Sequence, residues 1–486
     1  MTSSILLKLF SRQSCFLTLA FILLSGCSRI DHKQSTLDPK GLIAQNQYDL
    51  FMLSVWITIF LFCAVGGCLL YVLWKFRVKN KEEAMEVPPQ THGNSKIETS
   101  LILASTVILV ILAIPTLQGV VLMNRVPDPN DKALLEKLKL DKSQIEGAIT
   151  VNVTGKRFYW VFEYPQFGIV TANELVFPAS KAVRINLTSD DVIHSFWLPK
   201  LAGKMDVMPG HENFMWFIAD EDKIRSRVDP DGQAYTEDLE VAMPSVFDGK
   251  MREAVFKKQD FHAEFEPVGG VFYGQCAEFC GNSHAYMSFR GLAQTDKDFD
   301  AWKNRMQDAQ NPNLHPVAYD DEKEYAKDSI VTFADDSLGK GALREYRTPN
   351  GASKGEAPNL SSGVWEKVHS NDYELGKVVF NSSQCGQCHA LDRPAAGAKG
   401  PNLALFGLRT SLAAGWMRND RESLSKWLEN SNEVKFGNLM WNAKSVVNFK
   451  PTKEQKEDGI AQHPLRELKN HPEKIDQLVT YLLGQR

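Results

Sequence analysis

The chain has 486 residues, a formal net charge of −4 and 43% hydrophobic residues. This length accommodates two or three domains, each with a core of its own. The sequence lacks the concentrated basic patch that nucleic-acid binding requires, so we expect no nucleic-acid partner. Its eight cysteines do not form an obvious disulfide framework.

Residues 1–26 have the pattern of an export signal. Lys8 and Arg12 precede an apolar stretch at 16–24, which is followed by small residues. The ending at 24–27 resembles a bacterial lipobox and implies cleavage before Cys27, with a lipid on its thiol. An ordinary signal or an uncleaved anchor is the alternative. In each case the following chain begins on the outer side of the inner membrane.

Two apolar runs predict a transmembrane hairpin over residues 45–125. The runs at 50–74 and 97–123 are each long enough to cross a bilayer, and Glu98 is the one carboxylate, at the entrance of the second. A cluster of Lys and Arg residues at 75–81 places the connection in the cytoplasm by the positive-inside rule. We therefore predict a protein of the bacterial inner membrane, in contact with lipid, whose later domains face the periplasm.

Short alternating runs predict an all-β domain over residues 148–298. The runs at 151–153, 183–187 and 214–218 alternate as half-buried strands do. A polar excursion at 219–261 interrupts the pattern, and it is either a partner-binding loop or a solvated insertion.

Two further regions follow the predicted β domain. Residues 299–371 are rich in charge, Pro, Gly and Ser, and predict a linker with some helix. Residues 372–486 have a helical pattern, and the last predicted helix carries Leu478, Tyr481 and Leu482 on one side. A helical domain with so few apolar anchors would gain stability from a cofactor in its core.

The segment 276–287 gathers soft ligands for a metal. Cys276 and Cys280 are four residues apart, and His284 and Met287 follow within seven more. Such a set favours copper over magnesium or calcium. A structural zinc site is an alternative that needs no methionine, and a disulfide or a chance cluster is another. His194, far upstream, is positioned between strands from which it can fold back onto the cysteines.

Together these residues resemble the CuA domain of subunit II of the haem–copper cytochrome c oxidases. The matching segments are 192–199, 204–206 with 209–210, and 273–287, and the hairpin with its outward β domain matches over 45–295. The resemblance implies a cupredoxin-like Greek-key barrel holding a binuclear copper centre. The implied copper ligands are His194, Cys276, Cys280, His284, Met287 and the backbone carbonyl of Glu278.

The resemblance implies two further points about Glu278. The first is that its side chain contributes to a magnesium site at the interface with subunit I. It also separates this chain from nitrous oxide reductase, which usually has an aromatic residue there. Quinol oxidases of the same superfamily lack the copper ligands, whereas all six positions are present in this sequence.

The segment 385–389 reads Cys-x-x-Cys-His, the motif of covalent haem c attachment. Cys385 and Cys388 would add to the haem vinyl groups and His389 would bind the iron. A zinc or redox Cys-x-x-Cys is the alternative. Residues 400–403 resemble the cytochrome c loop whose proline carbonyl orients the haem histidine. Residues 435–440 resemble the loop that supplies the distal ligand, so we expect Met440 in that role, with Met417 as the alternative.

A CuA subunit followed by an all-α class I cytochrome c domain resembles the fused oxidase subunits of several bacteria. The resemblance implies electron flow from a soluble or membrane cytochrome c, or another donor, through haem c to CuA. From there electrons reach haem a of subunit I, where haem a3 and CuB reduce oxygen while protons are pumped. Subunit III is a further implied partner. The competing class is a membrane-tethered electron-transfer lipoprotein that serves another terminal reductase.

Two positions of the oxidase resemblance concern proton and electron entry. Glu98 matches a glutamate at the entrance of a proton channel, and its alternative is a boundary residue that faces lipid headgroups. Phe158 aligns with the tryptophan thought to receive electrons from soluble cytochrome c. This departure leads to the hypothesis that the fused haem domain makes that surface entry unnecessary.

Overall fold

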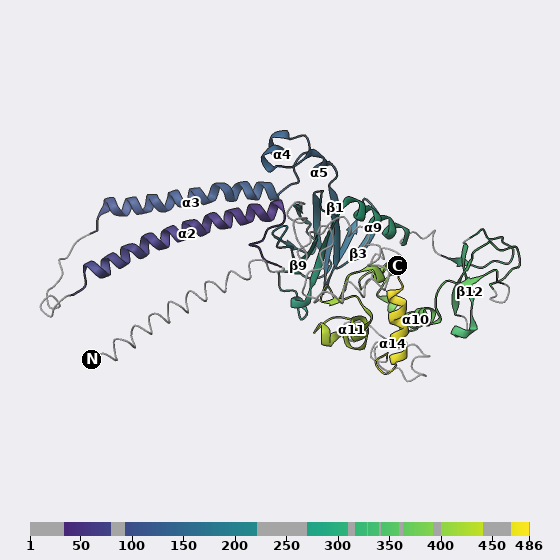
Figure 1. The fold of residues 1–486 in the computed structure, drawn as a ribbon. Helices are drawn as coiled ribbons and strands as arrows, with labels where there is room; N and C mark the ends of the chain where they lie inside the picture. The colour runs from purple at the N-terminus through teal and green to yellow at the C-terminus, as the bar shows by residue number, and fades with distance from the viewer. Residues whose placement is uncertain are drawn as a thin grey trace, which may run out of the picture. The chain divides into compact units, whose positions relative to one another are not determined.

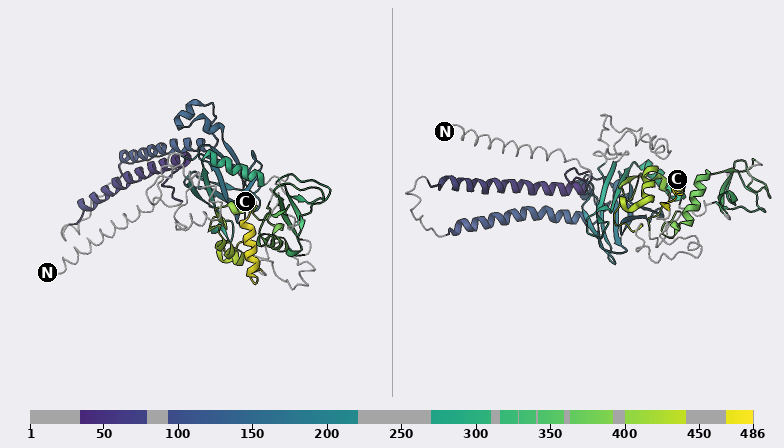
Figure 2. Two further views of the ribbon diagram at one scale, coloured as in Figure 1. Left: turned by 45° about the vertical axis from the view of Figure 1, so that its right-hand side comes forward. Right: turned by 90° about the horizontal axis from the view of Figure 1, so that it is seen from below.

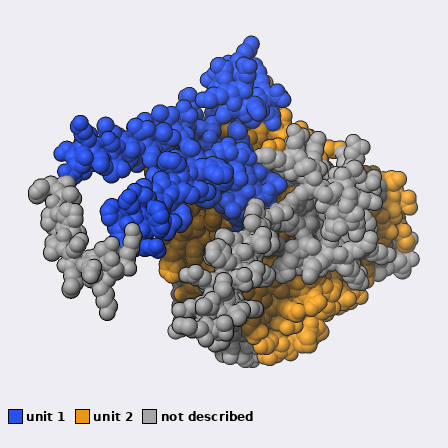
Figure 3. All heavy atoms as spheres, turned by 60° about the vertical axis from the view of Figure 1, so that its left-hand side comes forward, with its two compact units in different colours: residues 1–145, 199–203 blue, residues 146–198, 204–486 orange. Residues whose placement is uncertain are grey.

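The structure is a computed structural model that describes residues 34–78, 93–220, 270–309, 316–327, 329–339, 342–358, 363–391, 400–440 and 468–485. The chain divides into two compact units, 1–145 with 199–203 and 146–198 with 204–486, which Figure 3 draws in different colours. The predicted signal, Cys27 and all but the first two residues of the 219–261 excursion lie outside the described residues.

The first unit is built on two long apolar helices, α2 (Leu42–Lys75) and α3 (Ser95–Met123). They run side by side in Figures 1 and 2, and Gln47 Nε2 lies 3.4 Å from Met123 Sδ. Both are long and apolar enough to cross a membrane, and they contain the predicted spans at 50–74 and 97–123. The Asn94 side chain caps α3 by accepting from the N–H groups of the first turn. The short helices α4 (Lys132–Leu138) and α5 (Lys142–Glu146) follow.

The second unit begins with two five-stranded sheets. The first has the order β3 (Ile169–Ala172), β2 (Tyr159–Tyr164), β1 (Ile149–Lys156), β5 (Val183–Ser189) and β8 (Asn213–Phe217). The second has the order β4 (Glu174–Pro178), β10 (Ser288–Gln294), β9 (Gly270–Cys276), β6 (His194–Trp197) and β7 (Lys204–Val207). β1 pairs with β5, and β4 with β10, in parallel, and the other neighbours are antiparallel.

An aromatic core joins the two sheets. Trp160 of β2 packs edge-on against Phe196 of β6 at a centroid distance of 5.4 Å, and Phe196 stacks on Phe289 of β10 at 4.5 Å. All three rings are buried. A side chain at Gly274 would collide with the Phe289 ring, so glycine is required at that point of β9. The expectation of an all-β, cupredoxin-like domain is confirmed, and the predicted strands correspond to β1, β5 and β8.

The expected linker over 299–371 holds a folded sheet, which corrects that expectation. After helix α9 (Asp296–Ala309) come β11 (Val317–Ala318), β12 (Ser329–Ala334), β13 (Leu343–Thr348) and β14 (Glu366–Lys367), which form one sheet in chain order. Tyr325, Val331, Tyr346 and Trp365 make its core. Two of these strands have only two residues, which is too short to produce a recognisable periodicity in the sequence.

Three helices form most of the described part of the C-terminal region: α10 (Asn371–Ser382), α11 (Arg421–Val434) and α14 (Pro472–Leu483). A two-stranded sheet, β15 (Ser411–Leu412) with β16 (Met417–Arg418), lies in the connection between α10 and α11. α10 crosses α14 at Gly376, where a Cβ atom would collide with the backbone oxygen of Gln477. Leu478 and Leu482 of α14 are buried with Phe380 of α10 in the core of this region.

Candidate metal and cofactor sites

The second unit brings the predicted copper ligands into one cluster. His194 Nδ1 lies 3.9 Å from Cys276 Sγ, which lies 3.9 Å from Cys280 Sγ. Cys280 Sγ is 3.6 Å from His284 Nδ1 and 3.7 Å from Met287 Sδ, and Cys276 Sγ is 3.2 Å from the Glu278 carbonyl oxygen. Because metal–ligand bonds of about 2.0–2.3 Å separate neighbouring ligand atoms by about 3.5–4 Å, these spacings suit metal ligation. The two sulfurs are too far apart for a disulfide, whose length is about 2.05 Å.

The pairing of β6 with β9 explains how residues distant in sequence meet. Phe196 is the register partner of Cys276, so His194, at the start of β6, lies close to the end of β9. The Cys276 N–H donates to the Met287 carbonyl at 2.9 Å and closes the loop that carries Cys280 and His284. His194, both cysteines and Met287 are buried. The sheets therefore hold the cluster in place through backbone pairing and core packing.

Asp191 orients the histidine, a role that the sequence analysis did not assign. Its Oδ1 accepts from His194 Nε2 at 2.9 Å, which leaves Nδ1 facing Cys276. Arg157 donates to Oδ2 through its backbone N–H at 2.8 Å and its Nε at 3.1 Å. Burial disfavours the Asp191 carboxylate, but these donors hold its pKa well below the usual range. Carboxylate partners of this kind commonly fix the ring orientation of metal-binding histidines.

The pKa values of the two thiols in the cluster are shifted in opposite directions. The hydrogen bond with Cys280, outweighing burial and helped by His194, lowers the pKa of the Cys276 thiol to about 4. The hydrogen bond to Cys276 and burial raise the pKa of Cys280. One proton therefore leaves the pair readily, whereas a second negative charge beside the first is disfavoured. A bound cation would supply the charge needed to keep both sulfurs as thiolates.

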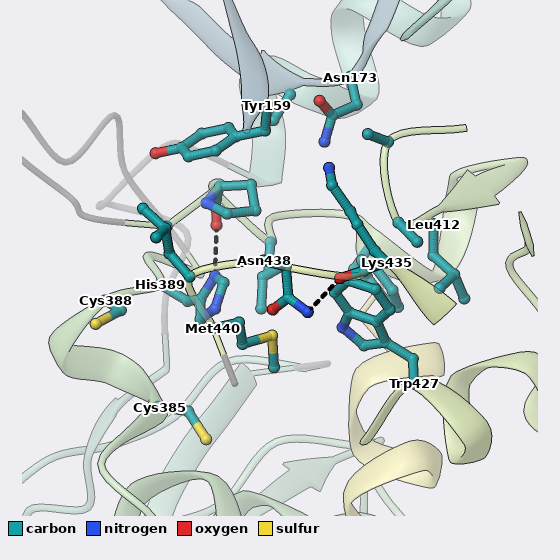
Figure 4. Close-up of a pocket in the computed structure, with 18 of the residues that line it drawn as sticks. Tyr159, Asn173, Cys385, Cys388, His389, Leu412, Trp427, Lys435, Asn438 and Met440 are labelled. Carbon is teal, nitrogen blue, oxygen red and sulfur yellow. Dashed lines mark hydrogen bonds between the residues drawn. The ribbon is translucent and has the colours of Figure 1, made fainter. Parts of the chain in front are cut away.

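A cavity of about 580 Å³ lies beside the helices of the same unit. Cys385, Cys388, His389 and Met440 all line it, and Figure 4 shows their side chains around one space. Much of the remaining wall is apolar, and this wall includes Phe380, Leu403, Phe406, Leu424, Leu478 and Leu482. A volume of this size and a mostly apolar lining with a few polar groups are typical of cofactor sites. The residues therefore fit a haem that is bound through two thiols.

His389 is held in an orientation suited to metal binding. Its Nδ1 donates to the Pro401 carbonyl at 2.8 Å, which directs the other ring nitrogen away from that bond. Burial lowers the pKa of His389, so the ring is neutral, as a ligand must be. Met440 lines the cavity, whereas Met417 is absent from the described residues that form its wall. The geometry thus favours Met440 over Met417 as the distal ligand.

The β sandwich supplies part of the cavity wall. Phe158, Tyr159 and Asp191 line it, and the Phe158 carbonyl accepts from Lys435 Nζ at 2.5 Å. Burial lowers the pKa of Lys435 to about 7. Phe158 is itself buried, so its ring is not an open surface. The copper cluster and the cavity consequently share a boundary inside one unit.

A second contact between the sandwich and the helical region depends on one carboxylate oxygen. Glu174 Oε1 accepts from the backbone N–H and the hydroxyl of both Thr410 and Ser411, at 2.8–3.1 Å. Trp416 Nε1 also donates to the Tyr286 carbonyl at 3.1 Å. These contacts join residues more than 120 positions apart, and no short sequence motif indicates them.

Glu98 lies in the first unit and the other predicted site residues lie in the second. It is exposed in the first turn of α3, just after the Asn94 cap. A carboxylate at this position interacts favourably with the positive end of the helix dipole. This placement agrees with either sequence interpretation.

Comparison with known proteins identifies the family. The family model described as "Cytochrome C oxidase subunit II, periplasmic domain" matches residues 169–225, which include His194 but end before the Cys276 segment. Cytochrome c oxidase subunit 2 of Bacillus sp. (strain PS3) is 32% identical over 86% of this chain and 88% of its own length. The chain belongs to the subunit II family of the cytochrome c oxidases. Membership of this family places the chain among the haem–copper oxidase proteins.

Other similar proteins match a smaller share of this chain. Quinol oxidase subunit 2 of Bacillus spizizenii (strain ATCC 23059 / NRRL B-14472 / W23) is 26% identical over 63% of this chain and 74% of its own length. The periplasmic domain of Bradyrhizobium japonicum cytochrome oxidase subunit II is a solved structure with 27% identity. It covers 33% of this chain and 93% of its own, with a TM-score of 0.23.

Proposed function

We propose that this subunit II is the electron inlet of a haem–copper oxidase and carries two redox centres. Electrons would pass from a donor to a covalent haem c, then to a binuclear CuA centre, and then to haem a of subunit I. The observation that carries the proposal is that one compact unit holds both a soft-ligand cluster and a cavity lined by Cys-x-x-Cys-His. The two sites share the boundary at Phe158 and Lys435.

The copper site would use side chains and one backbone oxygen. Cys276, Cys280, His194 and His284 would hold two copper ions. Met287 and the Glu278 carbonyl would complete the ligand set, in keeping with their positions beside the two sulfurs. When bound, such a pair of ions accepts and releases one electron. The protein contributes a rigid, mostly buried cage that limits rearrangement when the charge changes.

The haem site would use the C-terminal region as a class I cytochrome c domain. Cys385 and Cys388 would hold the haem covalently, His389 would be the proximal ligand and Met440 the distal one. The Pro401 carbonyl fixes the imidazole, and the apolar wall excludes water. The alignment with the Bacillus sp. (strain PS3) relative supports this assignment, because the aligned part of the chain extends into the C-terminal region. Coverage of 86% exceeds what residues before Asn371 can provide, so that relative matches part of this region.

We propose that the exposed side of the copper site faces subunit I. Glu278 is exposed next to the cluster, and the large apolar side chains of Ile193 and Phe279 beside it are 46% and 75% exposed. Exposed apolar side chains grouped around a redox centre suit a docking surface. We propose that the Glu278 carboxylate joins a magnesium site there and that Glu98 serves proton uptake. The redox domains would lie in the periplasm, and oxygen reduction and proton pumping would occur in subunit I, with subunit III as a further partner.

Co-purification with metal analysis tests the proposal. The chain is purified in a mild detergent, and the preparation is analysed for copper, covalent haem and accompanying membrane subunits. We expect two copper ions and one haem per chain, together with a many-span haem a protein. An isolated lipoprotein that carries both centres would instead favour the electron-transfer lipoprotein that serves another reductase.

The donor is proposed to reach the haem rather than the copper. Phe158 is buried under the loop that carries Lys435, so an external protein has no open surface at that position. Variants lacking the haem ligands should therefore lose reduction of copper by soluble cytochrome c. A normal rate of copper reduction in such a variant would show that a direct entry exists.

A further inference from the structure

We propose that residues 435–440, the donor loop, and residues 280–284, the ligand turn, form the electron-transfer contact between the two centres. Lys435 is the residue that positions this contact. The inference rests on the proposed function and adds the route and the residues that fix it. The donor loop ends at Met440, which lines the haem cavity, and the ligand turn carries Cys280 and His284 of the copper cluster.

Two hydrogen bonds tie the donor loop to the copper side. Ser283 Oγ donates to the Phe436 carbonyl at 2.5 Å, and Lys435 Nζ donates to the Phe158 carbonyl at 2.5 Å. Ser283 is fully buried and Lys435 is 4% exposed. Burial of a lysine amine is costly unless it is hydrogen-bonded, so this contact defines where the loop can lie.

The backbones of the two segments also approach closely. A Cβ atom added at Gly437 would lie 2.7 Å from the Asn282 Cβ, and Gly437 has a positive φ of 75°. A larger residue would push the loop away from the turn. Two hydrogen bonds hold the shape of the loop: Asn438 Nδ2 donates to the Lys435 carbonyl within it at 2.8 Å, and the Gly437 N–H donates to Asn432 Oδ1 of α11 at 2.9 Å.

These contacts complete a short chemical route. From Cys280 the backbone leads in three residues to Ser283, and one hydrogen bond then crosses to Phe436. Four further residues reach Met440. Every step is covalent except the single hydrogen bond. The route therefore depends on the position of the donor loop, which Lys435 fixes from the opposite side.

The Glu174 contact has a different role in this arrangement. Its four hydrogen bonds go to Thr410 and Ser411, which belong to neither the donor loop nor the ligand turn. It can hold the helical region on the sandwich when the route is altered. Loss of one hydrogen bond at the donor loop should therefore change the rate of transfer without detaching the region.

The test uses the oxidase complex with Lys435→Met and Ser283→Ala in its subunit II. Lys426→Met is the matched control, because Lys426 is exposed on α11 and pairs with Glu422 at 2.7 Å, away from the donor loop and the ligand turn. The haem is reduced by a light-driven electron donor and the appearance of reduced copper is timed. Copper content, haem content and the spectra of both centres are measured on the same samples.

We expect each of the two variants to slow haem-to-copper transfer by about tenfold, because loss of the hydrogen bond lets the donor loop move away from the ligand turn. Both centres should keep their contents and spectra, and Lys426→Met should behave as the wild type. Lys435→Gln, which keeps an N–H donor, should recover part of the rate.

Two results would overturn the inference. One is a wild-type transfer rate in both variants with both centres loaded. The other is loss of haem or copper from both variants, which would make Lys435 and Ser283 structural supports rather than positioning residues. Failure of the proposed function is distinguishable, because the wild-type chain would then lack one of the centres before any rate is measured.

Discussion

The copper cluster and the proposed haem cavity differ in how far protein atoms alone form the site. The cluster has its ligand atoms 3.2–3.9 Å apart, held by strands β6 and β9 and by a core of three packed aromatic rings. The cavity has about 580 Å³ of space inside a region whose apolar residues line it rather than fill it. Protein atoms alone therefore set the geometry of one site, whereas the other contains space that the proposed haem would fill.

The largest effect is expected from removing both haem-attaching thiols, Cys385→Ser with Cys388→Ser. Without a haem, the apolar side chains that line the cavity would meet water instead of a cofactor, so this region would lose much of the apolar burial that stabilises it. We expect no covalent haem and an unfolded C-terminal region, detected as rapid proteolysis after 371 but not within 149–220 or 270–294. If the C-terminal region without haem resists the protease, the cavity does not depend on a cofactor, and the contrast drawn above with the copper cluster is wrong.

Replacement of Cys276 tests the other side of the comparison. Cys276→Ser should abolish the proposed binuclear copper signal, because one of the two thiols proposed to hold the copper is lost. The sandwich should keep its protease resistance, since Trp160, Phe196 and Phe289 pack against one another and none of them is a predicted ligand. Covalent haem should be retained at the wild-type level. Cys63→Ser, at an exposed position in α2, is the control and should leave copper unchanged.

A smaller effect is expected at the residue that orients His194. Asp191→Asn should weaken copper binding by about 10–100-fold, the usual effect of losing the partner of a metal-binding histidine. Competition with a copper chelator measures the change. Asp190→Asn is the neighbouring control, because Asp190 pairs with Lys156 rather than with a predicted ligand. Equal copper affinities in the two variants would argue against preorganisation by Asp191.

The smallest effect is expected from the distal methionine. Met440→Ala should leave covalent attachment intact, because Cys385 and Cys388 are unchanged, but it should alter the visible spectrum of the haem. Met417→Ala, outside the cavity wall, should leave the spectrum unchanged. The reverse result would assign the distal position to Met417.

The sequence predicted features that lie within short segments. The two apolar runs, the alternating strands and the Cys-x-x-Cys-His motif each occupy a continuous stretch, and their local patterns are strong. The copper residues were found because His194 and the 276–287 segment each match a motif, although 82 positions separate His194 from Cys276. The resemblance, rather than periodicity, joined these two segments.

Features that depend on distant partners could not be predicted in this way. Lys435 contacts Phe158 across 277 positions, and Glu174 contacts Ser411 across 237. A lysine in a polar loop gives no indication that it is buried. The small sheet at 317–367 has short strands and a core of a few scattered aromatic residues, so the sequence of this segment favours a linker. Asp191 carried a weak signal, as an acidic residue three positions before a candidate ligand.

The crossing of α10 and α14 at Gly376 has a consequence for biogenesis. The two helices pack against each other although about ninety residues of sequence separate them, and Leu478 and Leu482 of α14 form part of the cavity wall. That wall does not exist until residues 472–483 have been synthesised. The thiols of Cys385 and Cys388 are made about ninety residues earlier. The order of synthesis would thus leave the Cys-x-x-Cys-His motif open for attachment of the proposed haem until the last helix completes the wall.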